Sequence, residues 1–261
     1  MLTWCSYCQQ FQGEVPPYED LSVTHGICAR CEPGVLDLTA ADFAHARMLQ
    51  RLQSQLMEAG RRGDVHQAVH IITDAVNANV RAVDVLMGIV APLLYRIGKD
   101  WENGVISVAE EHRFTKFCER VYKSIVVRIH AVDPGDAAQA DHADVLLVNA
   151  PGNTHTLAVR ILALWLANHG VRAWVLYRTP GIDDLVALVA RAQPRALLLS
   201  MALAEQRPCV VAIAERIAAL PGPLHPRIIV GGNAVKLGLV SAIPGAELMT
   251  DISQLPGAVS P

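Results

Sequence analysis

The stretch that organises the chain reads Trp101-Glu102-Asn103-Gly104-Val105-Ile106-Ser107-Val108-Ala109-Glu110-Glu111-His112. Asn103-Gly104 is a turn signal, and Ser107 with Glu110 three residues later is the pattern of a helix N-terminus with a capping box. The pattern predicts that one helix ends near Trp101 and that the next begins at Ser107, with Glu111-His112 in its first turns. Taken alone, it also fits an ordinary helix–turn–helix corner with a core tryptophan.

Around this corner, residues 36–133 carry apolar residues at helical spacing in four stretches, at 37–59, 65–76, 83–101 and 107–130. Gly60 and Gly63 are expected to break the first stretch, and Pro92 to kink or restart the third. Four amphipathic stretches with short links predict a four-helix bundle over residues 36–133.

The first 35 residues contain four of the six cysteines of the chain, arranged as two CxxC pairs with nineteen residues between them: Cys5, Cys8, Cys28 and Cys31. Four thiolates on two tight turns form a closed ligand set for structural zinc, and so short a segment needs such a staple to fold. Redox-active thiols are the alternative. The stretch from Thr24 to Cys31 resembles the zinc ribbons attached to some bacterial signalling proteins.

Beyond a linker-like stretch at residues 134–141, the periodicity of the sequence changes. Apolar runs at 144–150, 173–177, 196–200, 228–230 and 246–249 alternate with helical stretches at 155–168, 183–191 and 209–220. This alternation predicts a doubly wound, parallel, Rossmann-like sheet over residues 142–261.

Polar and small residues follow three of these strands, where such sheets bind their ligands. His155 follows the first strand, Ser200 and Leu203 the third, and Gly231-Gly232 the fourth. His155 is a candidate metal ligand, although a polar residue at a helix start is an equal alternative. Ser200 and the glycines leave room for a long ligand beside the sheet.

These residues resemble the cobalamin-binding fold, which is often preceded by a four-helix bundle. The usual histidine motif of that fold is Asp-x-His-x-x-Gly, and this chain has Asn153-Thr154-His155-Thr156-Leu157-Ala158. The resemblance implies that His155 is the lower ligand of cobalt and that the cofactor's tail passes Ser200, Leu203 and Gly231-Gly232. Asn153 would orient the ring without the charge of the usual carboxylate.

The bundle resembles that of the CarH-type cobalamin photoreceptors, whose W-x9-EH marker is present as Trp101, Glu111 and His112. The resemblance implies that Trp101 covers the upper axial group of cobalamin, 5′-deoxyadenosyl in adenosylcobalamin, while Glu111 and His112 form hydrogen bonds with it. Photolysis of the cobalt–carbon bond would then shift the bundle against the sheet domain and change partner binding. A corrinoid carrier subunit of a methyltransferase shares the two-domain plan and is the alternative from another class. Pairing of cobalamin with a bilin as a second chromophore is a further one.

Two departures from this family matter. The family has a second histidine after the tryptophan, which captures cobalt after photolysis, and here that position is Glu102. His66 and His70 would be the substitutes, unless they are merely solvent-facing. The family also carries a DNA-binding domain at its N-terminus, where this chain has the cysteine module. The chain thus resembles stand-alone regulators of the AerR kind, which implies a transcription factor as protein partner, a homo-oligomer such as a dimer, and no direct binding of DNA.

The resemblance implies a regulator without turnover of its own, and composition bears on its partners and location. The net charge is −3 without a long basic run, which argues against a nucleic-acid surface. The sequence lacks a long uncharged apolar run and a secretion-like N-terminus, so we expect no membrane span and a cytoplasmic location. Cys118 and Cys209 are isolated and are expected to be core residues.

Overall fold

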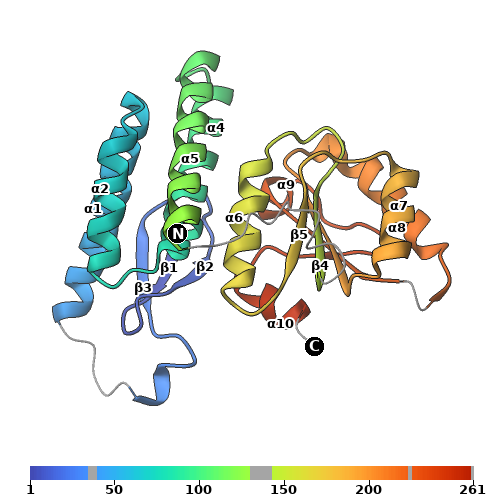
Figure 1. Ribbon diagram of the computed structural model, residues 1–261, viewed down its shortest axis with the longest axis horizontal. Coiled ribbons are helices and arrows are strands. Elements are labelled where there is room, and N and C mark those ends of the chain that lie inside the picture. Colours follow the sequence, from blue (N-terminus) through green and yellow to red (C-terminus); the bar gives the residue numbers. More distant parts are fainter. Residues whose placement is uncertain (35–39, 130–142, 223–224, 260–261) are drawn as a thin grey trace. The chain divides into compact units, whose positions relative to one another are not determined.

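The computed structural model describes residues 1–34, 40–129, 143–222 and 225–259 (Figure 1). The chain divides into two compact units, Met1–Ala131 and Val132–Pro261. The linker predicted at residues 134–141 lies outside the described residues. Within the described parts of the chain, no helix combines the length and the apolar character needed to cross a bilayer.

The first unit opens with a small sheet of strand order β2-β1-β3, formed by β1 (Leu2–Cys5), β2 (Phe11–Glu14) and β3 (Val23–Gly26). β1 is antiparallel to β2 and parallel to β3. Its apolar side chains are buried, namely Leu2, Trp4, Phe11 and Val23. A short 3-10 turn, η1 (Glu32–Gly34), follows.

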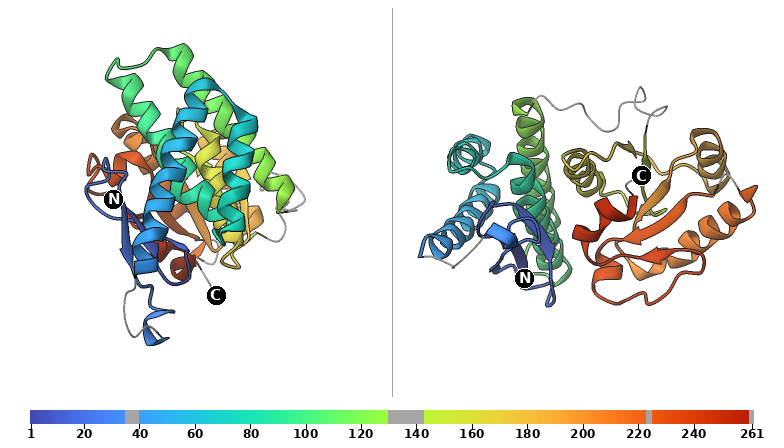
Figure 2. Two further views of the ribbon diagram at one scale, coloured as in Figure 1. Left: turned by 90° about the vertical axis from the view of Figure 1, so that its left-hand side faces the viewer. Right: turned by 90° about the horizontal axis from the view of Figure 1, so that it is seen from below.

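Four helices then form the predicted bundle: α1 (Ala40–Arg62), α2 (Val65–Asn77), α4 (Ala91–Glu102) and α5 (Val108–Arg128) (Figures 1 and 2). The short helix α3 (Ala82–Val85) and the π segment η2 (Leu86–Val90) lead directly into α4. The bundle core consists of apolar side chains at helical spacing, including Leu52, Leu56, Ile72, Leu86, Ile97, Phe114, Val121 and Ile125.

The expected break at Gly60 is wrong, whereas the break at Gly63 and the restart of the helix at Pro92 are confirmed. α1 continues through Gly60, and the reason for the glycine is packing, because a Cβ there would lie 2.4 Å from the ring of Phe114. The helix ends instead at Gly63, whose φ of +70° is left-handed. Pro92 lies in the first turn of α4, and the irregularity is the π segment before it, where the Ala91 N–H donates to the Leu86 carbonyl.

The second unit is a five-stranded parallel sheet of order β5-β4-β6-β7-β8, as the alternating pattern predicted. Its strands are β4 (Val145–Asn149), β5 (Ala173–Leu176), β6 (Ala196–Ser200), β7 (Arg227–Gly231) and β8 (Glu247–Leu248). The connecting helices are α6 (Thr156–Ala167), α7 (Ile182–Ala192), α8 (Arg207–Ala218) and α9 (Asn233–Lys236), and the described part ends with α10 (Leu255–Val259). Short 3-10 turns, η4 (Ala204–Gln206) and η6 (Ile252–Gln254), precede α8 and α10.

Helices cover both faces of this sheet (Figure 1). α7 and α8 pack on one face and share a core with alternate strand residues, among them Leu146, Val148, Leu197, Leu199 and Val230. α6 packs on the opposite face. The intervening strand residues, such as Leu147 and Leu198, are also buried, which explains why the strands are continuous apolar runs rather than alternating ones.

Candidate functional site

The order of the strands places a switch point between β4 and β6. The chain leaves β4 toward β5 on one side and leaves β6 toward β7 on the other, so the connections after these two neighbouring strands run in opposite directions. Ligands of doubly wound sheets bind at such a point, beyond the carboxyl ends of the strands. His155 follows β4 and Ser200 ends β6, so the fold brings both to this edge.

The loop after β4 is held by Asn153, which is buried. Its amide nitrogen donates to the Ser200 carbonyl at 3.1 Å and to Asn149 Oδ1 at 3.3 Å. Its side-chain oxygen accepts the His155 backbone N–H at 3.0 Å. Asn153 therefore fixes the backbone on which His155 stands, while the imidazole itself is exposed at the start of α6.

The loop after β6 is held by Gln206, a residue that the sequence analysis did not single out. Its buried side chain accepts the backbone N–H groups of Ala202 and Leu203 at 2.9 and 3.1 Å. This leaves Leu203 half exposed at the sheet edge. The sequence does contain a signal for this role, because Gln206 directly precedes helix α8, which has a proline in its first turn.

The two glycines after β7 are required by the backbone around them. Gly232 has a φ of +104°, and a Cβ there would lie 2.4 Å from the Met201 carbonyl. A Cβ on Gly231 would lie 3.3 Å from the Met249 carbonyl. Backbone atoms of the same chain thus occupy the space that was expected for a ligand at these Cβ positions. The absence of side chains on the glycines allows the loops after β6 and β7 to pack closely.

The corner between α4 and α5 has the predicted geometry. α4 ends in a Schellman motif, in which Val105 N–H donates to the Asp100 carbonyl and Gly104 N–H to the Trp101 carbonyl. Ser107 and Glu110 then form a complete capping box for α5. The corner leaves Trp101 46% exposed, and Val105 and Val108 are exposed as well.

Glu111 and His112 lie in the first turns of α5. Glu111 accepts a hydrogen bond from the Thr115 hydroxyl at 2.7 Å, and its second oxygen lies 3.5 Å from His112 Nε2. His112 is exposed, and so is Glu102. His66 and His70 are exposed on α2.

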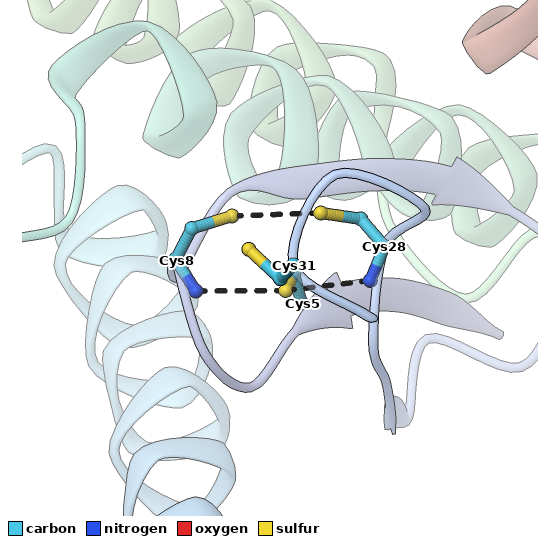
Figure 3. Close-up of side chains that lie close together, drawn as sticks. All are labelled: Cys5, Cys8, Cys28 and Cys31. Atoms are coloured by element: carbon cyan, nitrogen blue, oxygen red, sulfur yellow. Dashed lines mark hydrogen bonds between the residues drawn. The ribbon is translucent and has the colours of Figure 1, made fainter. Parts of the chain in front are cut away.

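The four cysteines of the N-terminal sheet converge on one point (Figure 3). Their sulfur atoms all lie within 4.8 Å of one another, and Cys8 Sγ is 3.8 Å from Cys28 Sγ. A tetrahedral zinc site with Zn–S bonds of about 2.3 Å requires S···S distances of about 3.8 Å, so the thiols fit such an ion. Among the described residues this is the one cluster with the donors for a metal.

The acidity of these thiols also depends on the cluster. Burial by itself would raise the pKa of Cys5, but backbone N–H groups of Cys28 and Cys8, each 3.5 Å from its sulfur, outweigh this and lower the pKa to about 7. Burial and hydrogen bonds with the other sulfurs raise the pKa of Cys31 to about 12. Four thiolates would repel one another here, and a bound cation removes that cost.

The helical part of the chain matches a known protein family. Residues 52–123 match the family model described as the B12 binding domain. This stretch runs from α1 into α5 and contains Trp101, Glu111 and His112. The bundle is therefore similar in sequence to that family over these residues.

Two curated relatives extend the match. One is an uncharacterised 20.5 kDa protein from the bchF-crtJ intergenic region of Rhodobacter capsulatus, 26% identical over 157 residues, which are 60% of this chain and 79% of the relative. The other is the HTH-type transcriptional repressor CarH of Myxococcus xanthus, 29% identical over 123 residues, which are 47% of this chain and 38% of CarH. The chain thus spans well under half of the repressor's length.

Among solved structures, the monomethylamine corrinoid protein of Methanosarcina barkeri is similar in fold, with a TM-score of 0.63 at 14% identity. The similarity covers 80% of this chain and 97% of that protein. At this level of identity it supports the architecture of bundle and sheet.

Proposed function

We propose that the protein is a cobalamin-binding regulatory protein whose output is set by light. The observation that carries the proposal is the exposed His155 imidazole, which a buried asparagine holds at the switch point of the sheet, in a chain whose bundle matches the B12 binding domain. An imidazole with a free ring nitrogen is a suitable cobalt ligand. Similarity to the repressor CarH supports the regulatory role.

The sheet unit would supply the lower half of the site. His155 would bind cobalt, and Asn153 would keep the loop in place through its hydrogen bonds to Ser200 and His155. Ser200, Leu203, Gly231 and Gly232 would line the path of the cofactor's tail. Because the Asn153 amide is engaged by the backbone, the basicity of His155 would owe little to it.

The bundle would supply the upper half. The half-exposed indole of Trp101 would cover the upper axial group, and Glu111 and His112 would form hydrogen bonds with it. When bound, adenosylcobalamin supplies a cobalt–carbon bond that light breaks. Glu102 has no ring nitrogen with which to capture cobalt afterwards, so the response would depend on Trp101 gaining or losing its packing partner.

We propose a protein partner such as a transcription factor, which the N-terminal cysteine module or a face of the bundle would contact, and assembly of the chain as a homo-oligomer. The four cysteines would hold Zn²⁺. In this proposal the protein binds and releases its partner without catalysing a reaction. The residues named above act by holding and covering the cofactor.

The test of cobalt ligation compares three proteins loaded with cobalamin in the dark: the natural chain, His155→Ala and His225→Ala. His225 is also exposed but lies before β7, at the opposite end of the strands. We expect His155→Ala to lower the affinity for cobalamin by at least about tenfold and His225→Ala to leave it unchanged.

Labelling the protein's histidines with ¹⁵N provides the second readout. In the Co(II) form, the nitrogen splitting of the electron paramagnetic resonance spectrum should change on labelling in the natural chain and in His225→Ala, but not in His155→Ala. A splitting that never responds to the label would mean that the cofactor's own benzimidazole stays on cobalt, and the proposed lower ligand would be wrong.

A further inference from the structure

The N-terminal cysteine module packs against the bundle through its aromatic side chains. Trp4 and Phe11 are fully buried and meet edge to face, with ring centroids 5.4 Å apart. β2 contacts the π segment η2, and β3 contacts α1. Because these rings are buried where the module meets the bundle, the two parts share one core. Burial of two aromatic rings stabilises such a contact by several kcal/mol.

The contact is closest at Gly88, in the middle of η2. A Cβ on Gly88 would lie 2.4 Å from the Trp4 ring and 2.6 Å from the Phe11 ring. A glycine inside a helix costs about 1 kcal/mol relative to alanine, and here the cost is offset because only glycine lets the two rings reach the backbone. η2 is therefore the surface on which the module rests.

The module also contacts α4, the helix that follows η2, and it contacts α1. Glu19 pairs with Lys99 at 3.4 Å, and Lys99 lies two residues before Trp101. Gln53 on α1 donates to the Leu21 carbonyl at 3.1 Å. The ion pair is half exposed on both sides and contributes little energy by itself, but it places the module along the length of α4.

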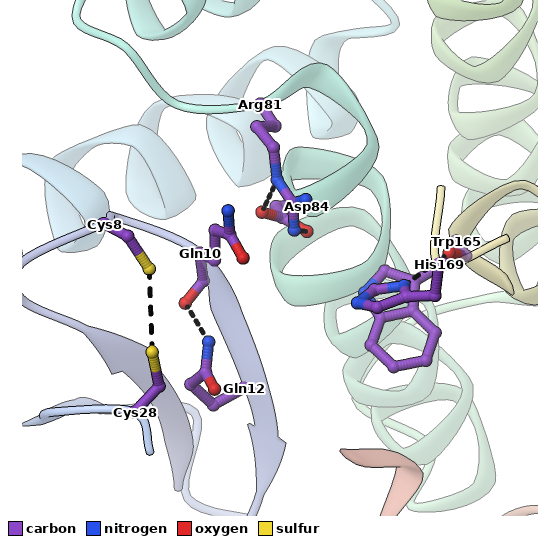
Figure 4. A network of polar contacts seen from close by, with 8 residues as sticks. All are labelled: Cys8, Gln10, Gln12, Cys28, Arg81, Asp84, Trp165 and His169. Carbon is purple, nitrogen blue, oxygen red and sulfur yellow. Dashed lines mark hydrogen bonds and ion pairs between the residues drawn. The ribbon is translucent and has the colours of Figure 1, made fainter. Parts of the chain in front are cut away.

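The beginning of the segment carries a buried ion pair. Asp84 is completely buried on α3, and Arg81 binds both of its oxygens, with distances of 2.7 and 2.9 Å (Figure 4). Figure 4 also shows Gln10 and Gln12 of the module, joined by a hydrogen bond of 3.1 Å at the start of β2.

The cysteine cluster is joined directly to the aromatic contact. Cys5 directly follows Trp4 on β1, so a ligand of the site and the main anchor of the contact are neighbours on one strand. Three strands of four residues each cannot bury a core of their own, and modules of this size fold when the metal binds. A metal bound by the four cysteines would therefore fix the strands that carry Trp4 and Phe11 over Gly88.

We infer that the four-cysteine site governs the packing of η2 and α4, so that occupancy by Zn²⁺ is a second input to the corner that carries Trp101. The coupling between the metal and the helix stands on the contacts at Gly88 and Lys99 alone. Its consequence for the capping of cobalamin rests on the proposed function. Because coupling between two equilibria is reciprocal, weakening the contact at Gly88 must also weaken the binding of Zn²⁺.

The experiment uses the full chain without cobalamin and a matched pair of substitutions, Gly88→Ala and Gly98→Ala. Gly98 lies in α4 with nothing within 4 Å of its Cβ position, so its substitution raises helix propensity without touching the module. Competition with a zinc chelator measures the affinity for Zn²⁺. Hydrogen exchange of the α4 amides, with α2 as internal reference, measures the order of the helix with and without the metal.

We expect Gly88→Ala to bind Zn²⁺ at least about tenfold more weakly than Gly98→Ala, which should match the natural chain. Removing Zn²⁺ from the natural chain should accelerate exchange of α4 at least about tenfold, and more than that of α2. Unfolding of the entire bundle on chelation would equally show that its order depends on the metal. Equal affinities of the two variants, or exchange of α4 that ignores the metal, would overturn the inference. None of these readouts involves cobalamin, so they separate this inference from the proposed function.

Discussion

At the scale of single residues, Trp101 is exposed to an unusual degree for the largest side chain of a bundle. Its 46% exposure means that truncation removes little buried surface within its own unit. We therefore expect Trp101→Ala to cost less than about 1 kcal/mol in stability. A core tryptophan, the plain alternative for this position, would cost about 3–5 kcal/mol on the same change.

The functional consequence of Trp101→Ala should be selective. Because the indole is proposed to pack on the upper axial group only, the variant should still bind cobalamin through His155. It should lose the preference of the natural chain for the adenosyl form, measured by titration with adenosylcobalamin and with hydroxocobalamin in the dark. Val127→Ala, at an exposed position near the far end of α5, is the control and should keep the preference. An unchanged preference in Trp101→Ala would show that the capping role is wrong.

Residue types and strand ends were enough to predict which residues follow the strands that flank the switch point, since the carboxyl ends of parallel strands share one edge. The reasons for individual residues were less accessible. Gly232 was expected to make room for a ligand, and its space is taken by the Met201 backbone. Gln206 was not predicted, because its role depends on two backbone N–H groups that only the folded loop turns toward it.

At the scale of elements, the amino ends of the central strands are tied together by Asp144, just before β4. Its carboxylate accepts two hydrogen bonds from the Arg172 guanidinium and one from the Arg172 backbone, and its carbonyl accepts the Arg195 N–H. Arg172 and Arg195 precede β5 and β6. The hydrogen bonds from Arg172 hold the pKa of Asp144 below its ordinary value, although partial burial opposes them.

This arrangement predicts a pH-dependent contribution to stability. A carboxyl whose pKa is lower in the folded state stabilises the fold above its unfolded pKa of about 3.9, and the contribution disappears as pH falls through the folded value. Asp144→Asn should therefore destabilise the sheet unit by about 1 kcal/mol at pH 7, with the gap to the natural chain closing below about pH 4. The urea midpoint of the sheet unit's unfolding, followed across this range, checks it.

Asp183→Asn is the matched control for that measurement. Asp183 pairs with Arg216, but both side chains are mostly exposed, so the change should stay within about 0.5 kcal/mol at every pH. A gap for Asp144→Asn that persists unchanged at low pH would mean that the carboxylate charge is not what stabilises the strands.

The elements themselves were predictable where one periodicity dominates. The apolar run at 196–200 is β6, because a strand buried on both faces of a sheet is apolar throughout. The capping pattern at Ser107 is the start of α5, because the unpaired N–H groups of a helix N-terminus favour such residues. Breaks inside helices were less predictable. Gly60 looked like a helix end, yet the glycine is explained by the ring of Phe114, a partner far along the chain.

At the scale of the whole molecule, the first unit combines a cluster of four cysteines with a bundle that matches the B12-binding-domain model, and the second is a parallel sheet covered by helices. The sequence signals for these parts are separate, since the cysteine pairs, the helical corner and the strand ends follow one another along the chain without overlap. What could not be predicted is that the cysteine module shares a core with the bundle. That depends on Trp4 and Phe11 meeting Gly88 across more than seventy positions of sequence.

The proposed output belongs to this scale, because light must change how the full chain assembles or binds a partner. Loaded with adenosylcobalamin, the natural chain should sediment differently in the dark and after green light. A hundredfold change in populations requires only about 2.7 kcal/mol of differential contact, within what one indole packed against a ligand can supply. Trp101→Ala should lose the difference while still undergoing the spectral change of photolysis.

Equal sedimentation and equal partner binding before and after light would favour a cobalamin sensor that works in the dark. Exchange of a methyl group with a partner enzyme, insensitive to light, would favour a corrinoid carrier, and either result would contradict the proposed light response.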